Sequence, residues 1–208
     1  MFSKNSKNAI NIIAKIAITA AAVGSIALFI VLSGFSGLRD FSLKFTNVFD
    51  ADLKVYSYQG KSIQFTEELE NRISNIKGIE AYTKIIEERV FIQYRGKNHV
   101  AKIKGVDPNF KHVIPIDSIL FLNNWLTPNR DEVVIGLGVS KKLSLGVLDY
   151  GNLLEIYVPK PGGGQILNAA DAFAKRKAVA SGMYSVNEEL DSEYIFSDID
   201  YARCLLAM

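Results

Sequence analysis

The chain has 208 residues, of which 49% are hydrophobic, and its charged residues are unevenly distributed. All 22 Asp and Glu residues and 21 of the 24 Lys and Arg residues follow Gly34, so this part is nearly neutral and the excess positive charge precedes it. Nucleic-acid binding would instead need a basic surface on the folded part, so the charge pattern excludes that class. The one cysteine, Cys204, excludes an intrachain disulfide framework, and we expect it to be a small buried residue of the last helix.

The first predicted element is an uncharged run of seventeen residues from Ile16 to Leu32. As a helix, with about 1.5 Å of rise per residue, it spans roughly 26 Å, close to the ~30 Å hydrocarbon core of a bilayer. It is either a cleaved signal peptide or a retained membrane anchor. Because the run is longer than the apolar core of a signal peptide, about 7–15 residues, and no convincing cleavage site follows it, we predict a transmembrane helix over residues 16–37.

Three lysines indicate the orientation of this helix. Lys4, Lys7 and Lys15 precede the apolar run with no acidic residue beside them. Because positively charged flanks stay on the cytoplasmic side, we expect a cytoplasmic N-terminus and residues 38–208 outside. Within residues 1–15 the lysines recur at helical spacing with isoleucines opposite them, which predicts an amphipathic helix at the cytoplasmic membrane surface before the chain turns into the bilayer.

Small residues line one face of the predicted span. Their spacing would let a neighbouring membrane helix approach closely. The alternative is that alanine is simply common in membrane anchors. The face consists of Ala17, Ala20, Ala21, Gly24 and Ala27.

Beyond the anchor, helical and alternating patterns follow one another and predict an α+β fold class, with a mixed α/β extracytoplasmic domain. Helices are expected from the N-cap Thr66 to residue 76 with Gly78 as its stop, at 140–145, and at 201–208 with Asp198 or Asp200 as N-cap. Strands are expected at 52–57, 85–94, 99–105, 133–135, 153–158, 179–186 and 194–196, and the second and third of these are predicted to form a hairpin around residues 95–98. The last helix is short and has no glycine cap. Either it packs against the domain through Leu205 and Leu206 or, as we expect, the natural polypeptide continues beyond Met208.

The sequence offers no candidate catalytic residues and no candidate metal ligands. Neither His99 nor His112 has a nucleophile or acid at a recognised spacing. The acidic clusters around Glu67, Glu87, Glu188 and Asp198 lack the glycine and terminal glutamate of a calcium loop. The first cluster fits a helix N-terminus, and the others are predicted to be solvated.

Two glycine patterns suggest nucleotide binding but depart from the motifs. Gly136-Leu137-Gly138 follows a strand and opens a helix, but Lys141 occupies the third glycine position of a dinucleotide fingerprint. The run from Gly162 to Gln165 lacks the Lys-Ser/Thr pair of a phosphate loop. We therefore expect no cofactor and no ATP hydrolysis by this chain itself.

A long connection between two predicted strands is a candidate site for docking a partner. Residues 159–177 exceed what a hairpin needs, with prolines at the start, glycines in the middle and basic residues at the end. The alternative is a solvated loop without a partner. The candidate residues are Pro159, Pro161, Gly162, Gly163, Gly164, Gln165, Lys175, Arg176 and Lys177.

The order of several segments resembles a superfamily of bacterial ABC permeases that includes the lipoprotein-releasing LolC/LolE permeases, the MacB exporters and FtsX-like cell-division proteins. The matching segments are Val31-Leu32-Ser33-Gly34-Phe35, Asp50-Ala51-Asp52-Leu53-Lys54-Val55, Gly105-Val106-Asp107-Pro108, Glu132-Val133-Val134-Ile135-Gly136, Leu143-Ser144-Leu145-Gly146-Val147, Gly151-Asn152, Ala180-Ser181-Gly182-Met183-Tyr184 and the helix from Tyr201 to Leu206. They span nearly the whole chain.

The resemblance implies a mechanotransmitting permease of the bacterial inner membrane, with a MacB-like periplasmic domain between the first and second of four membrane helices. Its implied partners are a cytoplasmic ABC ATPase, a second permease subunit, membrane lipids and, in the lipoprotein-releasing branch, a periplasmic lipoprotein carrier. This chain has one predicted span, so it resembles the N-terminal part of such a permease. The alternative is a complete single-pass protein whose outer domain is a binding or scaffold module. Three further spans in the genomic sequence past Met208 would favour the permease.

Overall fold

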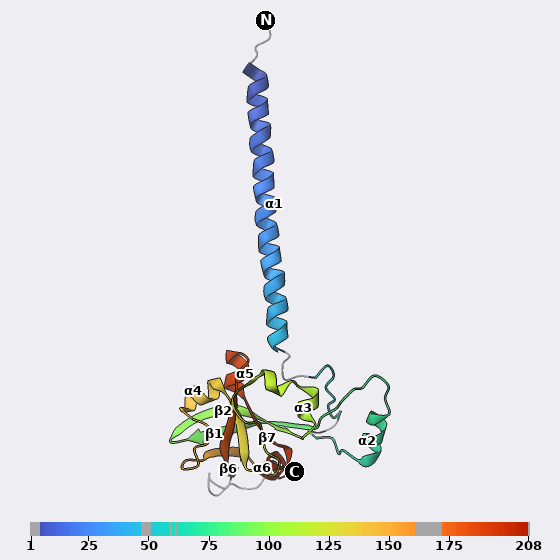
Figure 1. The fold of residues 1–208 in the computed structure, drawn as a ribbon, viewed down its shortest axis with the longest axis vertical. Helices are drawn as coiled ribbons and strands as arrows, with labels where there is room; N and C mark the ends of the chain where they lie inside the picture. Colours follow the sequence, from blue (N-terminus) through green and yellow to red (C-terminus); the bar gives the residue numbers. More distant parts are fainter. Residues whose placement is uncertain (1–4, 47–50, 59, 61, 161–171, 208) are drawn as a thin grey trace. The chain divides into compact units, whose positions relative to one another are not determined.

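The computed structural model describes residues 5–46, 51–58, 60, 62–160 and 172–207, and within the first of these ranges the side chains of residues 10–39. The chain divides into two compact units, Met1–Asn47 and Val48–Met208. The first unit is a helix and the second a mixed α/β domain (Figure 1). The predicted fold class, a long apolar helix followed by a mixed α/β domain, is confirmed.

The helix α1 runs without interruption over Asn5–Thr46, the blue element in Figure 1. Its portion Ile10–Arg39 is the one helix in the described part of the chain that is long and apolar enough to cross a membrane, judged by length and composition. The predicted turn between residues 1–15 and the span is not present within residues 5–46. No proline interrupts this range, so each of its residues has the backbone N–H that an α-helix requires.

The second unit is built on a seven-stranded sheet in the order β3-β6-β4-β7-β2-β1-β5. Because β6 also pairs with β5, the strands from β6 to β5 in this order form a closed ring of six, in which each strand pairs with two others. The seventh strand, β3, lies outside the ring and pairs only with the last residues of β6. The strands are β1 (Ile85–Tyr94), β2 (Lys97–Val106), β3 (Leu120–Asn123), β4 (Glu132–Gly136), β5 (Leu154–Pro159), β6 (Phe173–Tyr184) and β7 (Tyr194–Asp198).

Alternation along the strands divides the buried residues into two clusters, because successive side chains of a strand point to opposite faces. The first cluster includes Val90, Ile92, Ile103 and Ile156, with residues of α4 and α6 packed among them. The second cluster lies on the other face and includes Phe110, Trp125, Val134, Tyr184 and Phe196. The Trp125 ring lies 5.1 Å from the Phe196 ring, measured between centroids.

Short helices connect the strands. They are α2 (Glu67–Ser74), α3 (Phe110–Val113), the 3-10 helix η1 (Ile116–Ser118), α4 (Leu137–Leu143), α5 (Glu188–Glu193) and α6 (Ile199–Leu206). The predicted N-caps are confirmed, since Thr66 accepts from Leu69 N and Asp198 accepts from Asp200 N. The hairpin of β1 and β2 is also confirmed, with a tighter turn than predicted: Arg95 and Gly96 both have positive φ, as a two-residue type I′ turn requires.

Four local predictions were wrong. Residues 52–57 form no strand, because none of their backbone groups joins a ladder in the described part of the domain. Cys204 is exposed, because Tyr201 and Leu205 occupy the buried side of α6. Asp191 and Asp198, predicted to be solvated, are buried. Their carboxylates tolerate burial because they accept hydrogen bonds from the backbone N–H groups of Val186 and Asn129, respectively.

Candidate functional site

The predicted packing face lies on α1. Ala17, Ala20, Ala21, Gly24 and Ala27 are all exposed in the first unit, and a Cβ atom built on Gly24 would meet nothing within 4 Å. The surface is therefore open to a neighbouring helix, and its role in packing stays a prediction.

The predicted docking segment is shorter than expected, since β5 and β6 extend into it. Pro159 is the last residue of β5, and Lys175, Arg176 and Lys177 lie within β6 rather than at the end of a loop. Lys160 N donates to the Ala172 carbonyl at 2.8 Å and closes the ladder. The residues Pro161, Gly162, Gly163, Gly164 and Gln165 lie outside the described residues.

The three basic residues at the start of β6 are held by acidic partners. Lys175 Nζ lies 2.7 Å and Lys177 Nζ 3.4 Å from carboxylate oxygens of Glu155 on β5. On the opposite face Arg176 pairs with Asp131 at 2.8 Å. Exposed and half-buried residues alternate from Phe173 to Lys177, as expected of a strand. The prediction that these residues give the end of a loop a positive charge was wrong, because they lie in a strand and their charges are largely balanced by Glu155 and Asp131.

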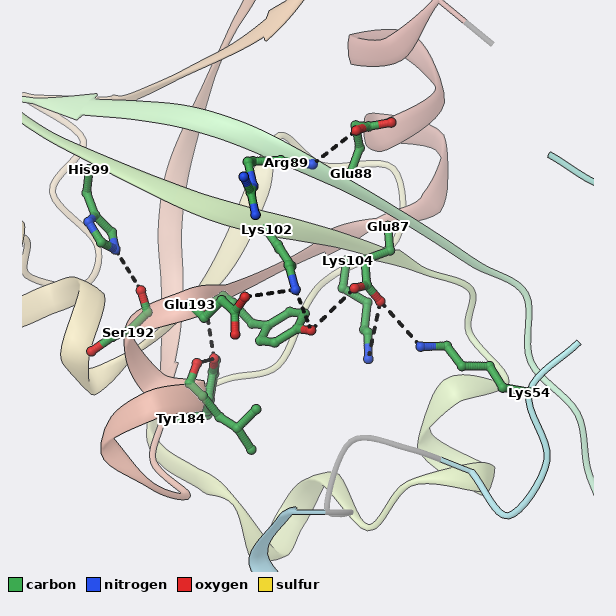
Figure 2. Close-up of polar contacts among 12 residues, drawn as sticks. Lys54, Glu87, Glu88, Arg89, His99, Lys102, Lys104, Tyr184, Ser192 and Glu193 are labelled. Carbon is green, nitrogen blue, oxygen red and sulfur yellow. Dashed lines mark hydrogen bonds and ion pairs between the residues drawn. The ribbon is translucent and has the colours of Figure 1, made fainter. Parts of the chain in front are cut away.

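A polar network that sequence reasoning missed lies on the outer face of β1 and β2 (Figure 2). Glu87 and Lys104 are register partners, and their charged atoms are 3.9 Å apart. Glu87 also forms an ion pair with Lys54, whose Nζ lies 3.5 Å away, and accepts a hydrogen bond from the Tyr194 hydroxyl at 3.3 Å. The Lys104 side chain is only 3% exposed, so its charge depends on carboxylate partners. Lys54 belongs to the segment that follows α1, so Glu87 ties this segment to the sheet.

The network continues along β2 to the end of α5. Lys102 Nζ lies 2.8 Å from Glu193, and this hydrogen bond raises the pKa of Lys102. On the opposite face of β2, His99 lies 2.6 Å from the Ser192 carbonyl through Nε2. Nε2 carries the donated hydrogen, because a carbonyl can only accept. His99 is thus a structural donor. The network contains no nucleophile paired with a base, and the contacts it makes are of a kind that hold elements in place.

The glycines of the Gly136-Leu137-Gly138 pattern serve close packing. A Cβ atom on Gly136 would overlap the backbone of Asp191, and one on Gly138 would overlap Ser192. The start of α4 is therefore covered by α5, which leaves no room there for a pyrophosphate. Within the described residues no group of three or more His, Cys, Asp and Glu side chains could hold a metal ion.

No protein-family model matches the chain, and no curated protein sequence matches it. Among solved structures, the chain is similar to the extracellular domain of the noncanonic ABC-type transporter YknZ from Gram-positive bacteria. The TM-score is 0.48 and the sequence identity 14%, over 69% of this chain and 67% of that chain. The likeness is to the extracellular domain of an ABC-type transporter, and it is not specific to the lipoprotein-releasing branch.

Proposed function

We propose that this chain is part of an ABC transporter permease subunit of the mechanotransmitting type. The observation that carries the proposal is the combination of α1, apolar over Ile10–Arg39, with a mixed α/β domain that follows it. In such a subunit the N-terminus lies in the cytoplasm, α1 crosses the inner membrane and the second unit lies in the periplasm. The three lysines before the apolar run support this orientation.

The proposed subunit is not an enzyme by itself, and ATP is hydrolysed by a separate cytoplasmic ABC ATPase. Movement of the ATPase reaches the outer domain through the membrane helices. The tie between Lys54 and Glu87, 3.5 Å apart, supports a mechanical role, because it links the segment after α1 to the sheet. A second permease subunit would cover the small-residue face of α1.

The experiment is to purify the protein, tagged at its N-terminus, from its own membranes in mild detergent and to identify what accompanies it. We expect an ATPase with a phosphate-loop sequence and a second polypeptide with several spans. Recovery of the protein with neither would contradict the proposal. It would favour the second candidate, a single-pass binding or scaffold module.

The finer proposal is release of lipid-anchored proteins to a periplasmic carrier, which docks at the connection between β5 and β6. Its support is the order of the resembling sequence segments and the length of this connection. Deletion of Gly162–Gln165 should abolish carrier binding in a pull-down while the domain remains folded by circular dichroism. Undiminished binding by the folded deletion variant would contradict the docking role and leave the coarser permease proposal in place.

A further inference from the structure

An apolar row is exposed on the outer face of the sheet. Val100, Phe91, Tyr157 and Lys175 are successive register partners across β2, β1, β5 and β6, so their side chains lie on one face. Val100 is 53% and Phe91 38% exposed. Phe91 packs edge-on against Tyr157, with ring centroids 5.9 Å apart, and Lys175 Nζ lies 5.1 Å from the centroid of the Tyr157 ring. The row is thus an ordered apolar surface with a cation at one end.

Two cations face each other in the next row. Arg89 on β1 and Lys102 on β2 are register partners, and like charges directly opposite each other destabilise an antiparallel pair. Lys102 is paired with Glu193. Among the described residues the Arg89 guanidinium has no carboxylate or carbonyl partner. The dashed line at Arg89 in Figure 2 marks a different bond, which the backbone N–H of Arg89 donates to the Glu88 carboxylate.

The charges on this face are predominantly positive. The cations are Arg89, Lys102, Lys104, Lys175 and Lys177, and the carboxylates that pair with the lysines are Glu87, Glu155 and Glu193. Glu87 and Glu155 are each shared by two lysines, and Arg89 pairs with no carboxylate among the described residues. An anionic group from another molecule would therefore relieve the repulsion between Arg89 and Lys102.

We propose that this surface, the β1 face (Arg89, Phe91, Val100, Lys102 and Tyr157), binds an acidic protein segment. Such a segment places a carboxylate against Arg89 and an apolar side chain against Phe91 and Val100. The guanidinium is a planar fork that matches a carboxylate in two parallel hydrogen bonds. Neighbouring rows on one face are two residues apart, roughly 7 Å along a strand, a spacing that side chains of one peptide can span. A small free anion would leave the apolar row uncovered.

The test measures peptide binding to the full chain in phosphatidylcholine nanodiscs. The probe is a labelled short peptide in which glutamate and leucine alternate, and the matched control peptide carries lysine in place of glutamate. We expect the glutamate peptide to bind about tenfold more tightly than the lysine peptide. Arg89→Glu should weaken its binding by a similar factor, and Val100→Ser should weaken it by removing the apolar contact.

Lys142→Glu is the matched control for charge reversal, because Lys142 is exposed on α4, whose buried residues belong to the opposite cluster. It should leave the affinity within about twofold. Equal affinity for both peptides, or an unchanged affinity in Arg89→Glu and Val100→Ser, would overturn the proposal. Phosphatidylglycerol vesicles that bind the wild type and not Arg89→Glu, with no peptide binding, would overturn it in favour of a lipid surface. The assay involves no ATPase, so its failure leaves the proposed transport function standing.

Discussion

Glu155 on β5 and Lys175 on β6 form an ion pair across the two strands, with Lys175 Nζ 2.7 Å from Glu155 Oε2. The Tyr157 hydroxyl donates to the same oxygen at 2.7 Å, and Lys177 approaches the other oxygen. The hydrogen bond from Lys175, followed by those from Tyr157 and Lys177, lowers the pKa of Glu155 from 4.5 to about 2. Residues predicted from sequence to mark a free loop end thus hold two strands of the sheet together.

The lowered pKa of Glu155 predicts a pH-dependent contribution to stability. Between about pH 4.5 and pH 2 the Glu155 carboxylate stays charged in the folded state, whereas it takes up a proton in the unfolded state, because its pKa is about 2 when folded and near 4.5 when unfolded. Its contribution is therefore fully present above about pH 4.5 and is lost as the pH falls toward 2. Glu155→Gln should lower the free energy of unfolding by about 1 kcal/mol at pH 7. The difference from the wild type should shrink with falling pH.

The measurement is denaturation of the full chain in detergent, followed by fluorescence of Trp125, the one tryptophan of the chain. Trp125 is buried against Phe110 and Phe196, so its emission reports the packing of the outer domain. A difference between wild type and Glu155→Gln that stays constant from pH 7 to pH 3 would show that the ion pair does not lower the pKa.

Gly136→Ala should destabilise the outer domain strongly, because the added methyl group would overlap the backbone of Asp191 on α5. We expect a loss of about 2–3 kcal/mol in the same denaturation assay. Gly146→Ala is the control, because a Cβ atom there meets nothing within 4 Å. If both substitutions are equally tolerated, the close approach of α4 and α5 is not required for folding.

Glu87→Gln should cost more stability than Lys54→Ala. Both substitutions break the ion pair between Lys54 and Glu87, but Glu87→Gln also removes a charged partner of the buried Lys104. The Lys54 side chain is 32% exposed, so its loss should cost less than about 1 kcal/mol. Denaturation curves of the two variants compare these costs, and a larger loss for Lys54→Ala would contradict the central position of Glu87.

Gly24→Leu should weaken assembly with other membrane polypeptides, whereas Ile26→Leu should not. The leucine on Gly24 would prevent a neighbouring helix from approaching the small-residue face, and Ile26 lies on the other side of α1. Native gel electrophoresis of detergent-solubilised membranes checks the size of the assembly. Equal behaviour of the two variants would indicate that the alanines of α1 only fill an apolar span.

Residues from Asp52 onward should lie outside the cytoplasm, with α1 retained in the mature protein. A reporter that is active only in the periplasm, fused after Met208, should be active, because Lys4, Lys7 and Lys15 hold the N-terminus inside. Sequencing of the mature protein provides the second measurement. A new N-terminus between Ser33 and Gly37 would identify a cleaved signal peptide instead.

Patterns confined to a few neighbouring residues predicted much of the fold. The apolar helix, the hairpin of β1 and β2 and the N-caps Thr66 and Asp198 were predicted because each depends on local spacing or on one side chain beside one backbone group. Segment 52–57 has strand-like alternation too, but a strand also needs a partner ladder, which local sequence does not contain. Helix α5 was not predicted, because its acidic first turn resembles a solvated cluster in the sequence. The contact that buries Asp191, a hydrogen bond accepted from Val186 N, becomes apparent only in the folded domain.

The sequence by itself determined where the apolar helix lies, which residues form its small face and that the rest alternates between helix and strand, since these are matters of periodicity along the chain. Only the tertiary structure decided which charges meet. The pairing of Glu155 with Lys175 and of Glu87 with Lys104, and the repulsion between Arg89 and Lys102, depend on strand register. Shifting a strand by one residue would move every side chain to the other face, so contacts between distant residues follow from the assembled sheet.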